Sequence, residues 1–268
     1  MGKGAGHTAW QIRLQSAEGK QLMLIPGVTK DPTGALSGRL LVLSQGACRS
    51  LDYGGQAVQQ SGKMTHLRLG QSVLTDRGLW LHGATPELNL QGTVHFGPFL
   101  PVRYPLHRLP GMDCHQKVLS LYHQARGRVE LNGDVFTFRD TPAYMDLYAG
   151  KKLPRQYFWA QSLWRGSSFT LAVARCGRLS LCTAALYYKQ RLLRLSSLSG
   201  ARVERWDAEG AAIRWGRYLL LTDVLSRPDA AGECALRVRL WRDEELLLDH
   251  RDMLATVWYR DEKKTDDS

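Results

Sequence analysis

The chain has 268 residues, 44% of them hydrophobic and 23% charged. This length gives one large domain or two ordinary ones with a hydrophobic core, and the composition excludes an intrinsically disordered chain. The formal net charge of +11 suits an anionic partner, but the arginines are spread along strand-like segments, so nucleic acid is not expected as a partner.

The chain begins with a Gly-rich segment, residues 1–8, that has no apolar run typical of a signal peptide. No later stretch approaches the roughly 18 apolar residues of a membrane-spanning helix. We therefore expect a cytoplasmic protein, and peripheral contact with an anionic membrane stays open.

Apolar and polar residues alternate with a period of two in several segments, most clearly in residues 65–69, 88–96 and 236–240. This period places one set of side chains inward and the other in water, as in a half-buried strand. Helical periodicity is weak, and residues 116–124 fit a short helix or a strand. A turn followed by a strand is favoured over a helix for residues 243–248.

Turn residues separate the expected strands. Asn132-Gly133 lies between two alternating runs and predicts a tight β-hairpin, because both residues tolerate positive φ. Many short strands at even spacing indicate a barrel or a sandwich. Four prolines in residues 98–110 are poorly suited to a sheet and predict a linker. We place a boundary near Gly111, giving halves 1–110 and 111–268.

Five cysteines are present, an odd number without a CxxC pair. They predict neither a zinc site nor a full disulfide framework, and they suit small buried residues in a reducing compartment. His115 beside Cys114 is poor evidence for a metal, so we expect no metal and no cofactor.

The middle of the chain carries a series of landmarks in fixed order. They are Met112-Asp113-Cys114-His115, Val118-Leu119-Ser120, His123, Gly127, Ala143-Tyr144-Met145-Asp146, Gly150, Pro154, Tyr157-Phe158-Trp159 and Gln161. This series resembles the tocopherol cyclase family, and with upstream elements the resemblance covers roughly residues 22–162.

The resemblance implies an all-β fold of two lipocalin-like antiparallel β-barrel halves packed together, with an apolar cavity. It also implies an apolar or prenylated small-molecule ligand. In the plant enzymes a proton adds to a trisubstituted alkene, and a phenolic oxygen captures the tertiary cation. Such a reaction requires an acid in an apolar site that excludes water.

Asp146 stands where the family has Glu and is the candidate catalytic acid, because desolvation raises a carboxyl pKa. Tyr144, Trp159 and Gln161 are candidate substrate-binding residues. On a strand, Tyr144 would share a face with Asp146, and Trp159 would share a face with Gln161. Asp146 as an exposed or hydrogen-bonded structural residue is the alternative, and Trp159 and Gln161 are equally compatible with core and strand-edge roles.

His123 and Asp113 match the family's spacing and are further substrate-binding candidates, although structural hydrogen bonds would explain them too. The sequence departs from the family where its second acid becomes Tyr148 and a histidine becomes Gln116. Tyr148 donates hydrogen bonds but is a far weaker acid. It is kept as a binding candidate.

Three hypotheses follow from these residues. The first is a tocopherol cyclase-like isomerase acting on a prenylated substrate. The second is a non-catalytic carrier of a lipid or isoprenoid, because the acid pair is broken. The third is an interaction module that uses its basic surface. The sequence does not indicate an oligomeric state.

Overall fold

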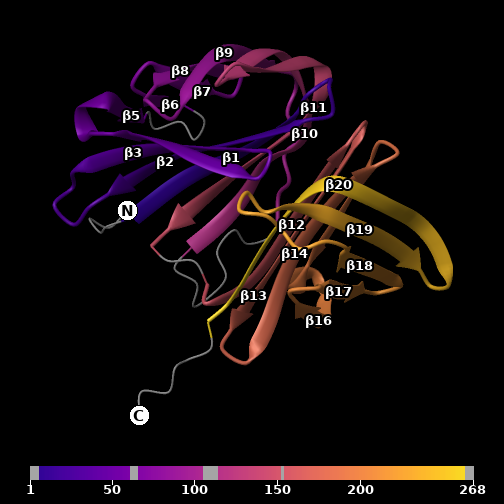
Figure 1. Ribbon diagram of the computed structural model, residues 1–268. Coiled ribbons are helices and arrows are strands. Elements are labelled where there is room, and N and C mark those ends of the chain that lie inside the picture. The colour runs from indigo at the N-terminus through magenta and orange to yellow at the C-terminus, as the bar shows by residue number, and fades with distance from the viewer. Residues whose placement is uncertain (1–5, 61–65, 105–113, 152–153, 263–268) are drawn as a thin grey trace. The chain divides into compact units, whose positions relative to one another are not determined.

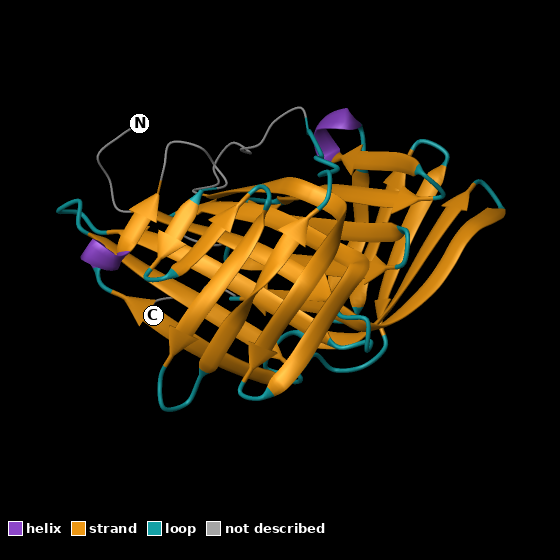
Figure 2. Ribbon diagram, turned by 90° about the horizontal axis from the view of Figure 1, so that it is seen from above, coloured by secondary structure: helices purple, strands orange, loops and turns teal. Residues whose placement is uncertain are grey.

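The computed structural model describes residues 6–60, 66–104, 114–151 and 154–262. Strands make up nearly all of the regular structure (Figure 2), so the predicted all-β class is confirmed. Within these residues, the helical structure consists of two short 3-10 turns, η1 (Gly55–Ala57) and η2 (Ser197–Ser199). No helix in the described part of the chain has the length and hydropathy needed to cross a bilayer.

The first compact unit comprises described residues up to 101 together with 116–151, and its strands form one antiparallel sheet of 11 strands. The sheet order is β4-β3-β2-β1-β11-β10-β9-β8-β7-β6-β5 (Figure 1). The strands are β1 Gly6–Gln15, β2 Gln21–Lys30, β3 Leu36–Ser44, β4 Ala47–Tyr53, β5 Val58–Gln60, β6 Leu67–Leu69, β7 Ser72–Thr75, β8 Gly78–Ala84, β9 Asn89–Phe96, β10 Cys114–Leu131 and β11 Asp134–Gly150. The sheet curls into a barrel. This is seen from β3, near one edge of the sheet, which also contacts β5 and β6 at the opposite edge.

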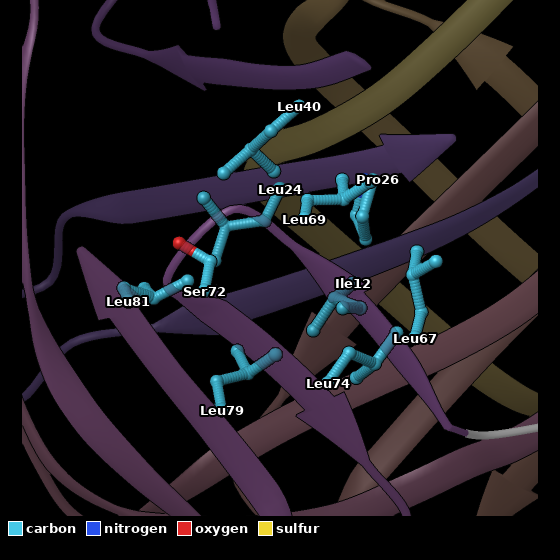
Figure 3. A pocket seen from close by; sticks show the side chains of 10 residues that line it. All are labelled: Ile12, Leu24, Pro26, Leu40, Leu67, Leu69, Ser72, Leu74, Leu79 and Leu81. Atoms are coloured by element: carbon cyan, nitrogen blue, oxygen red, sulfur yellow. The ribbon is translucent and has the colours of Figure 1, made fainter. Parts of the chain in front are cut away.

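The interior of the first barrel is filled by apolar side chains. Trp10, Ile12 and Leu14 of β1 point inward together with residues from the neighbouring strands, as period-two alternation requires. Figure 3 shows Ile12, Leu24 and eight further side chains around a cavity of about 20 Å³. That volume is close to the room that one water needs, so this cavity is too small for a prenylated ligand.

The second compact unit comprises the described residues of 102–115 and 154–262, and its sheet has nine strands in the order β15-β14-β13-β12-β20-β19-β18-β17-β16. They are β12 Gln156–Trp164, β13 Ser167–Cys176, β14 Leu179–Tyr188, β15 Arg191–Ser196, β16 Arg202–Asp207, β17 Gly210–Trp215, β18 Tyr218–Val224, β19 Glu233–Arg242 and β20 Glu245–Asp261. This sheet also curls, bringing β14 against β16. Its interior is a separate apolar cluster that includes Phe158, Phe169 and Ile213.

The division of the chain differs from the predicted one at residue 110. The hairpin of β10 and β11 follows the predicted boundary in sequence, yet it pairs with β9 and β1 in the first sheet. Residues 97–104 contain no regular element, as expected for a linker, while Gly111 and the last linker prolines lie outside the described residues.

Local predictions from turn chemistry and alternation are confirmed. Asn132 and Gly133 have φ of 51° and 88° and join β10 to β11. Residues 116–124 belong to strand β10 rather than to a helix. Asp243, with φ of 54°, stands in a turn before strand β20.

Gly127 of β10 provides a test of the barrel's packing. Its φ is 147°, and a Cβ there would lie 2.1 Å from the carbonyl oxygen of Thr93 in β9. We expect Gly127→Ala to lower the free energy of unfolding by about 2–4 kcal/mol in urea or thermal unfolding. Gly54→Ala is the control, since its φ is −67° and nothing lies within 4 Å of its Cβ position. Equal stability of the two variants would contradict this packing.

Candidate active site

Tyr144 and Asp146 lie on the sheet face opposite the first barrel's interior. Their neighbours Ala143, Met145 and Leu147 belong to the apolar cluster, and successive side chains of a strand point to opposite faces. Asp146 therefore does not point into the apolar interior of the first barrel. The expectation of burial holds, because Tyr144 and Asp146 are 0% and 2% exposed.

The carboxyl group of Asp146 accepts two hydrogen bonds on one oxygen. The Tyr144 hydroxyl donates to Oδ2 at 3.0 Å, and the side-chain amide of Gln116 in β10 donates to the same atom. Burial raises the pKa of Asp146 to about 7, against the opposing effect of these two hydrogen bonds, which favour the charged form.

This arrangement determines where the proton of Asp146 lies. Because Oδ2 is occupied by two donors, the proton of the neutral acid belongs on Oδ1. A carboxyl with a pKa of about 7 is half protonated near neutral pH, which suits a general acid. Asp146 can therefore donate a proton from Oδ1 while Tyr144 and Gln116 stabilise the carboxylate that remains.

The same sheet face carries polar residues that the sequence reasoning missed. Gln11 and Arg13 of β1 lie opposite Asp146 and Tyr144 in the register, and they are 7% and 2% exposed. Arg13 donates from Nε to the side-chain oxygen of Gln21 in β2. Gln11 and Arg13 alternate with inward-facing Trp10, Ile12 and Leu14, a pattern that predicts solvent exposure for both. The buried polar residues around Asp146 therefore extend from β10 across β11 and β1 to β2.

A pocket of about 580 Å³ opens further along this face of the first unit. Its lining residues are His7, Gly27, Thr29, Ser37, Gly38, Arg39, Asp52, Tyr53 and Gly54. His7 lies opposite Gly150 in the register, and its ring centroid is 6.5 Å from that of Tyr148. Tyr148 is half-buried and follows Asp146 on the same face, so this predicted residue lies between the acid and the pocket.

The walls of this pocket combine a neutral imidazole with a charged pair. Nδ1 of His7 lies 3.0 Å from the Thr29 hydroxyl, and burial together with the Arg39 charge lowers the His7 pKa. Arg39 pairs with Asp52 at 2.5 Å. The pocket therefore offers both neutral hydrogen-bonding groups and a charged pair.

His123 is buried, and its hydrogen bond is separate from those of Asp146. Its Nδ1 lies 2.9 Å from the Ser120 hydroxyl, and its ring packs on Phe96 and Phe99 at centroid distances of 4.8 and 4.7 Å. Desolvation lowers its pKa to about 3, so the imidazole is neutral at physiological pH. Nε2 is buried without a partner among the described residues. Asp113, the other candidate at this spacing, lies outside them.

Trp159 and Gln161 lie in the second unit and share one face of β12. Phe158 and Ala160 belong to the interior cluster, so both candidates point to the opposite face. The Trp159 ring lies 5.2 Å from that of Trp258, and its Nε1 has no partner among the described residues. Gln161 is fully buried and donates to the Ser162 carbonyl at 3.1 Å.

The described residues contain no group of three or more His, Cys, Asp or Glu side chains arranged to hold a metal ion. All five cysteines are free thiols, and three of them, Cys114, Cys182 and Cys234, are buried. The burial expected from the sequence therefore holds for these three, whereas Cys48 is exposed and Cys176 is half-buried.

No family model and no curated protein matches this sequence. Solved structures do. CghA with bound Sch210972 has a TM-score of 0.62 at 10% identity, with 97% of this chain and 89% of that chain covered. The structural similarity alone decides the architecture. The fold is lipocalin-like.

Two further structures share this lipocalin-like fold. Kievitone hydratase from Nectria haematococca has a TM-score of 0.52 at 8% identity, covering 96% of this chain and 89% of that chain. A protein from Nitrosomonas europaea proposed to be an AttH has a TM-score of 0.55 at 12% identity, covering 96% and 91%. At such identities the similarity shows the fold alone, and the resemblance to tocopherol cyclases remains a prediction.

The raised pKa of Asp146 predicts a specific pH dependence of stability. Its pKa is about 7 in the folded chain, whereas that of an unperturbed aspartate is about 3.9, so the unfolded state loses the proton first as pH rises. Stability should therefore fall between about pH 4 and 7, by on the order of 3–4 kcal/mol from this group. Asp146→Asn removes the ionisation, so its stability advantage over wild type should grow across this range in urea unfolding.

Asp140→Asn provides the matched control for this experiment. Asp140 is exposed on the same strand and pairs with Arg126 at 2.6 Å. We expect its difference from wild type to stay small at every pH. A pH-independent difference between Asp146→Asn and wild type would show that the Asp146 carboxyl is not desolvated.

Proposed function

We propose that this protein binds an apolar, prenylated small molecule and isomerises it by acid-catalysed ring closure, with Asp146 as the acid. The observation that carries the proposal is the buried Asp146 carboxyl, whose pKa is raised to about 7 and whose Oδ2 accepts from Tyr144 and Gln116. Desolvation keeps about half of this group in the neutral acid form near pH 7, ready to give its proton to a substrate.

The proposed reaction needs no co-reactant. The Oδ1 proton of Asp146 adds to the less substituted carbon of a trisubstituted alkene, whose π electrons form the new C–H bond. The resulting tertiary cation is captured by a phenolic oxygen of the same molecule, which forms the C–O bond. The phenolic proton then returns to the Asp146 carboxylate, so substrate and product are isomers and the acid is regenerated.

Tyr144 and Gln116 act on this cycle through Oδ2. Both donate hydrogen bonds that become stronger when Asp146 carries a full charge, because charge-assisted hydrogen bonds are roughly twice as strong as neutral ones. They therefore stabilise the carboxylate that forms after proton transfer. The ring of Tyr148, on the same face, suits contact with an apolar or cationic carbon skeleton.

Acid chemistry on a double bond is also compatible with this fold. Kievitone hydratase shares the lipocalin-like architecture, and a hydratase adds water to its substrate. Acid-catalysed addition of water to a double bond and ring closure both begin with protonation. The two reactions differ in the nucleophile that captures the cation, so exclusion of water would favour the ring closure proposed here.

The absence of a second carboxyl at Tyr148 leaves one alternative function. Without catalysis, the same surface would make the protein a carrier of a lipid or isoprenoid. A single acid is sufficient for the cycle above, because the carboxylate that gives the proton also takes it back. The proposal therefore does not require a second acid at Tyr148.

Turnover of prenylated quinols tests the proposal. Purified protein is incubated with a series of prenylquinols, and products of unchanged mass are separated and identified as chromanols by mass spectrometry. We expect Asp146→Asn to lower kcat at least 100-fold, in keeping with the usual size of general acid catalysis. Asp140→Asn, the same substitution at an exposed position of β11, should keep activity within about twofold of wild type.

The pH profile separates an acid from a structural group. Because the pKa of Asp146 is about 7, kcat should be constant below this value and fall about tenfold per pH unit above it. Tyr148→Phe should retain the profile. Binding of prenylquinols without any product would refute catalysis and leave the carrier. Absence of binding in native mass spectrometry would exclude both functions.

A further inference from the structure

A basic groove lies between β14 and β16 of the second unit. Its volume is about 620 Å³. The lining residues are Arg175, Arg178, Leu179, Ser180, Leu181, Ser197, Ala201, Arg202, Val203, Glu204, Arg205 and Trp206. Four of them are arginines and one is acidic, so the groove carries a net positive charge.

The arginines of this groove differ in whether their side chains already have ion-pair or hydrogen-bond partners. Arg205 lies 3.7 Å from Asp207 and 3.8 Å from Asp223, and Arg175 donates to the Arg178 carbonyl at 3.3 Å. The side chains of Arg178 and Arg202 are exposed, and no hydrogen bond or ion pair joins either to a described residue. At least two guanidinium groups are therefore available to an external anion.

Apolar side chains project beside these arginines. Leu179 follows the turn at the tip of the β13–β14 hairpin and is 67% exposed. Leu198 of η2, next to the groove residue Ser197, is 44% exposed. Exposed leucines beside unpaired arginines are the pattern of a surface that contacts a lipid interface, where apolar tips enter and cations meet headgroups.

We propose that this groove docks the protein on the surface of an anionic phospholipid bilayer. Arg178 and Arg202 bind headgroup phosphates, and Leu179 enters the interface beside them. The proposal identifies the partner of the basic surface, and it does not depend on the activity of Asp146.

The details of the groove favour a bilayer over nucleic acid. Single-stranded nucleic acids bind through aromatic rings that are free to stack on bases. Trp206 is half-buried, its Nε1 donates to the Ser180 hydroxyl at 2.9 Å, and its ring contacts Tyr259 at 6.3 Å. A bilayer, in contrast, uses the exposed Leu179 as well as the arginines.

Vesicle binding tests this inference on the whole protein. Co-sedimentation is measured with vesicles of phosphatidylcholine alone and with vesicles that contain about 30% phosphatidylglycerol. We expect binding at least tenfold stronger to the anionic vesicles, and weaker when NaCl is raised from about 0.1 to 0.5 M, because salt screens exposed charges. Arg178→Glu/Arg202→Glu should lower the affinity at least tenfold.

Matched controls distinguish the groove from the general charge of the protein. Arg77→Glu/Arg128→Glu changes the net charge equally at two exposed arginines of the first unit, and it should change the affinity less than threefold. Leu179→Ser should weaken binding severalfold, whereas Leu246→Ser, at a leucine that is 42% exposed elsewhere, should not. Far-ultraviolet circular dichroism and thermal unfolding verify that each variant is folded.

Three results would overturn the proposal. Equal losses in the two double arginine variants would assign binding to net charge alone. Full release from vesicles by millimolar inorganic phosphate, with no effect of Leu179→Ser, would indicate a site for a soluble anion. Binding of a DNA duplex without binding to anionic vesicles would make nucleic acid the partner. Failure of prenylquinol turnover would leave these results unchanged, so the two proposals can fail separately.

Discussion

The burial of one carboxyl group on the second face of a β-sheet is the constraint on which the candidate site depends. An isolated Asp146 in water would be charged at neutral pH, and the hydrogen bonds from Tyr144 and Gln116 would favour that charge further. Desolvation outweighs both. The sheet holds the three side chains together, because β10 and β11 are joined by the tight turn at Asn132-Gly133.

Much of the fold could be predicted from the period of two alone. Residues 88–96 and 236–240 form strands with the expected faces inward, since a strand with one buried face imposes this alternation on its sequence. The boundary between the halves could not be read in the same way. Strand pairing is a long-range property, and nothing local in residues 114–150 indicates that this hairpin joins the N-terminal strands.

The site was predictable only in part, and for a related reason. Asp146 and Tyr144 were found through a resemblance, and their burial follows the expectation that it implies. Gln11 and Arg13 were missed because both faces of β1 are buried there, while polar residues at alternate positions normally indicate solvent. The size of the barrel interior was also beyond prediction, because it depends on how side chains from many strands fill the space.

The two faces of the first sheet have different roles. The inner face stabilises the barrel, and the opposite face carries the candidate acid. The interior, with its cavity of about 20 Å³, is packed closely enough to hold β1 and β11 in register. The opposite face is therefore free to carry groups that would be costly in a core, such as Asp146 and Arg13. Placing the acid outside a filled barrel gives it a rigid position and leaves its pKa to be determined by desolvation.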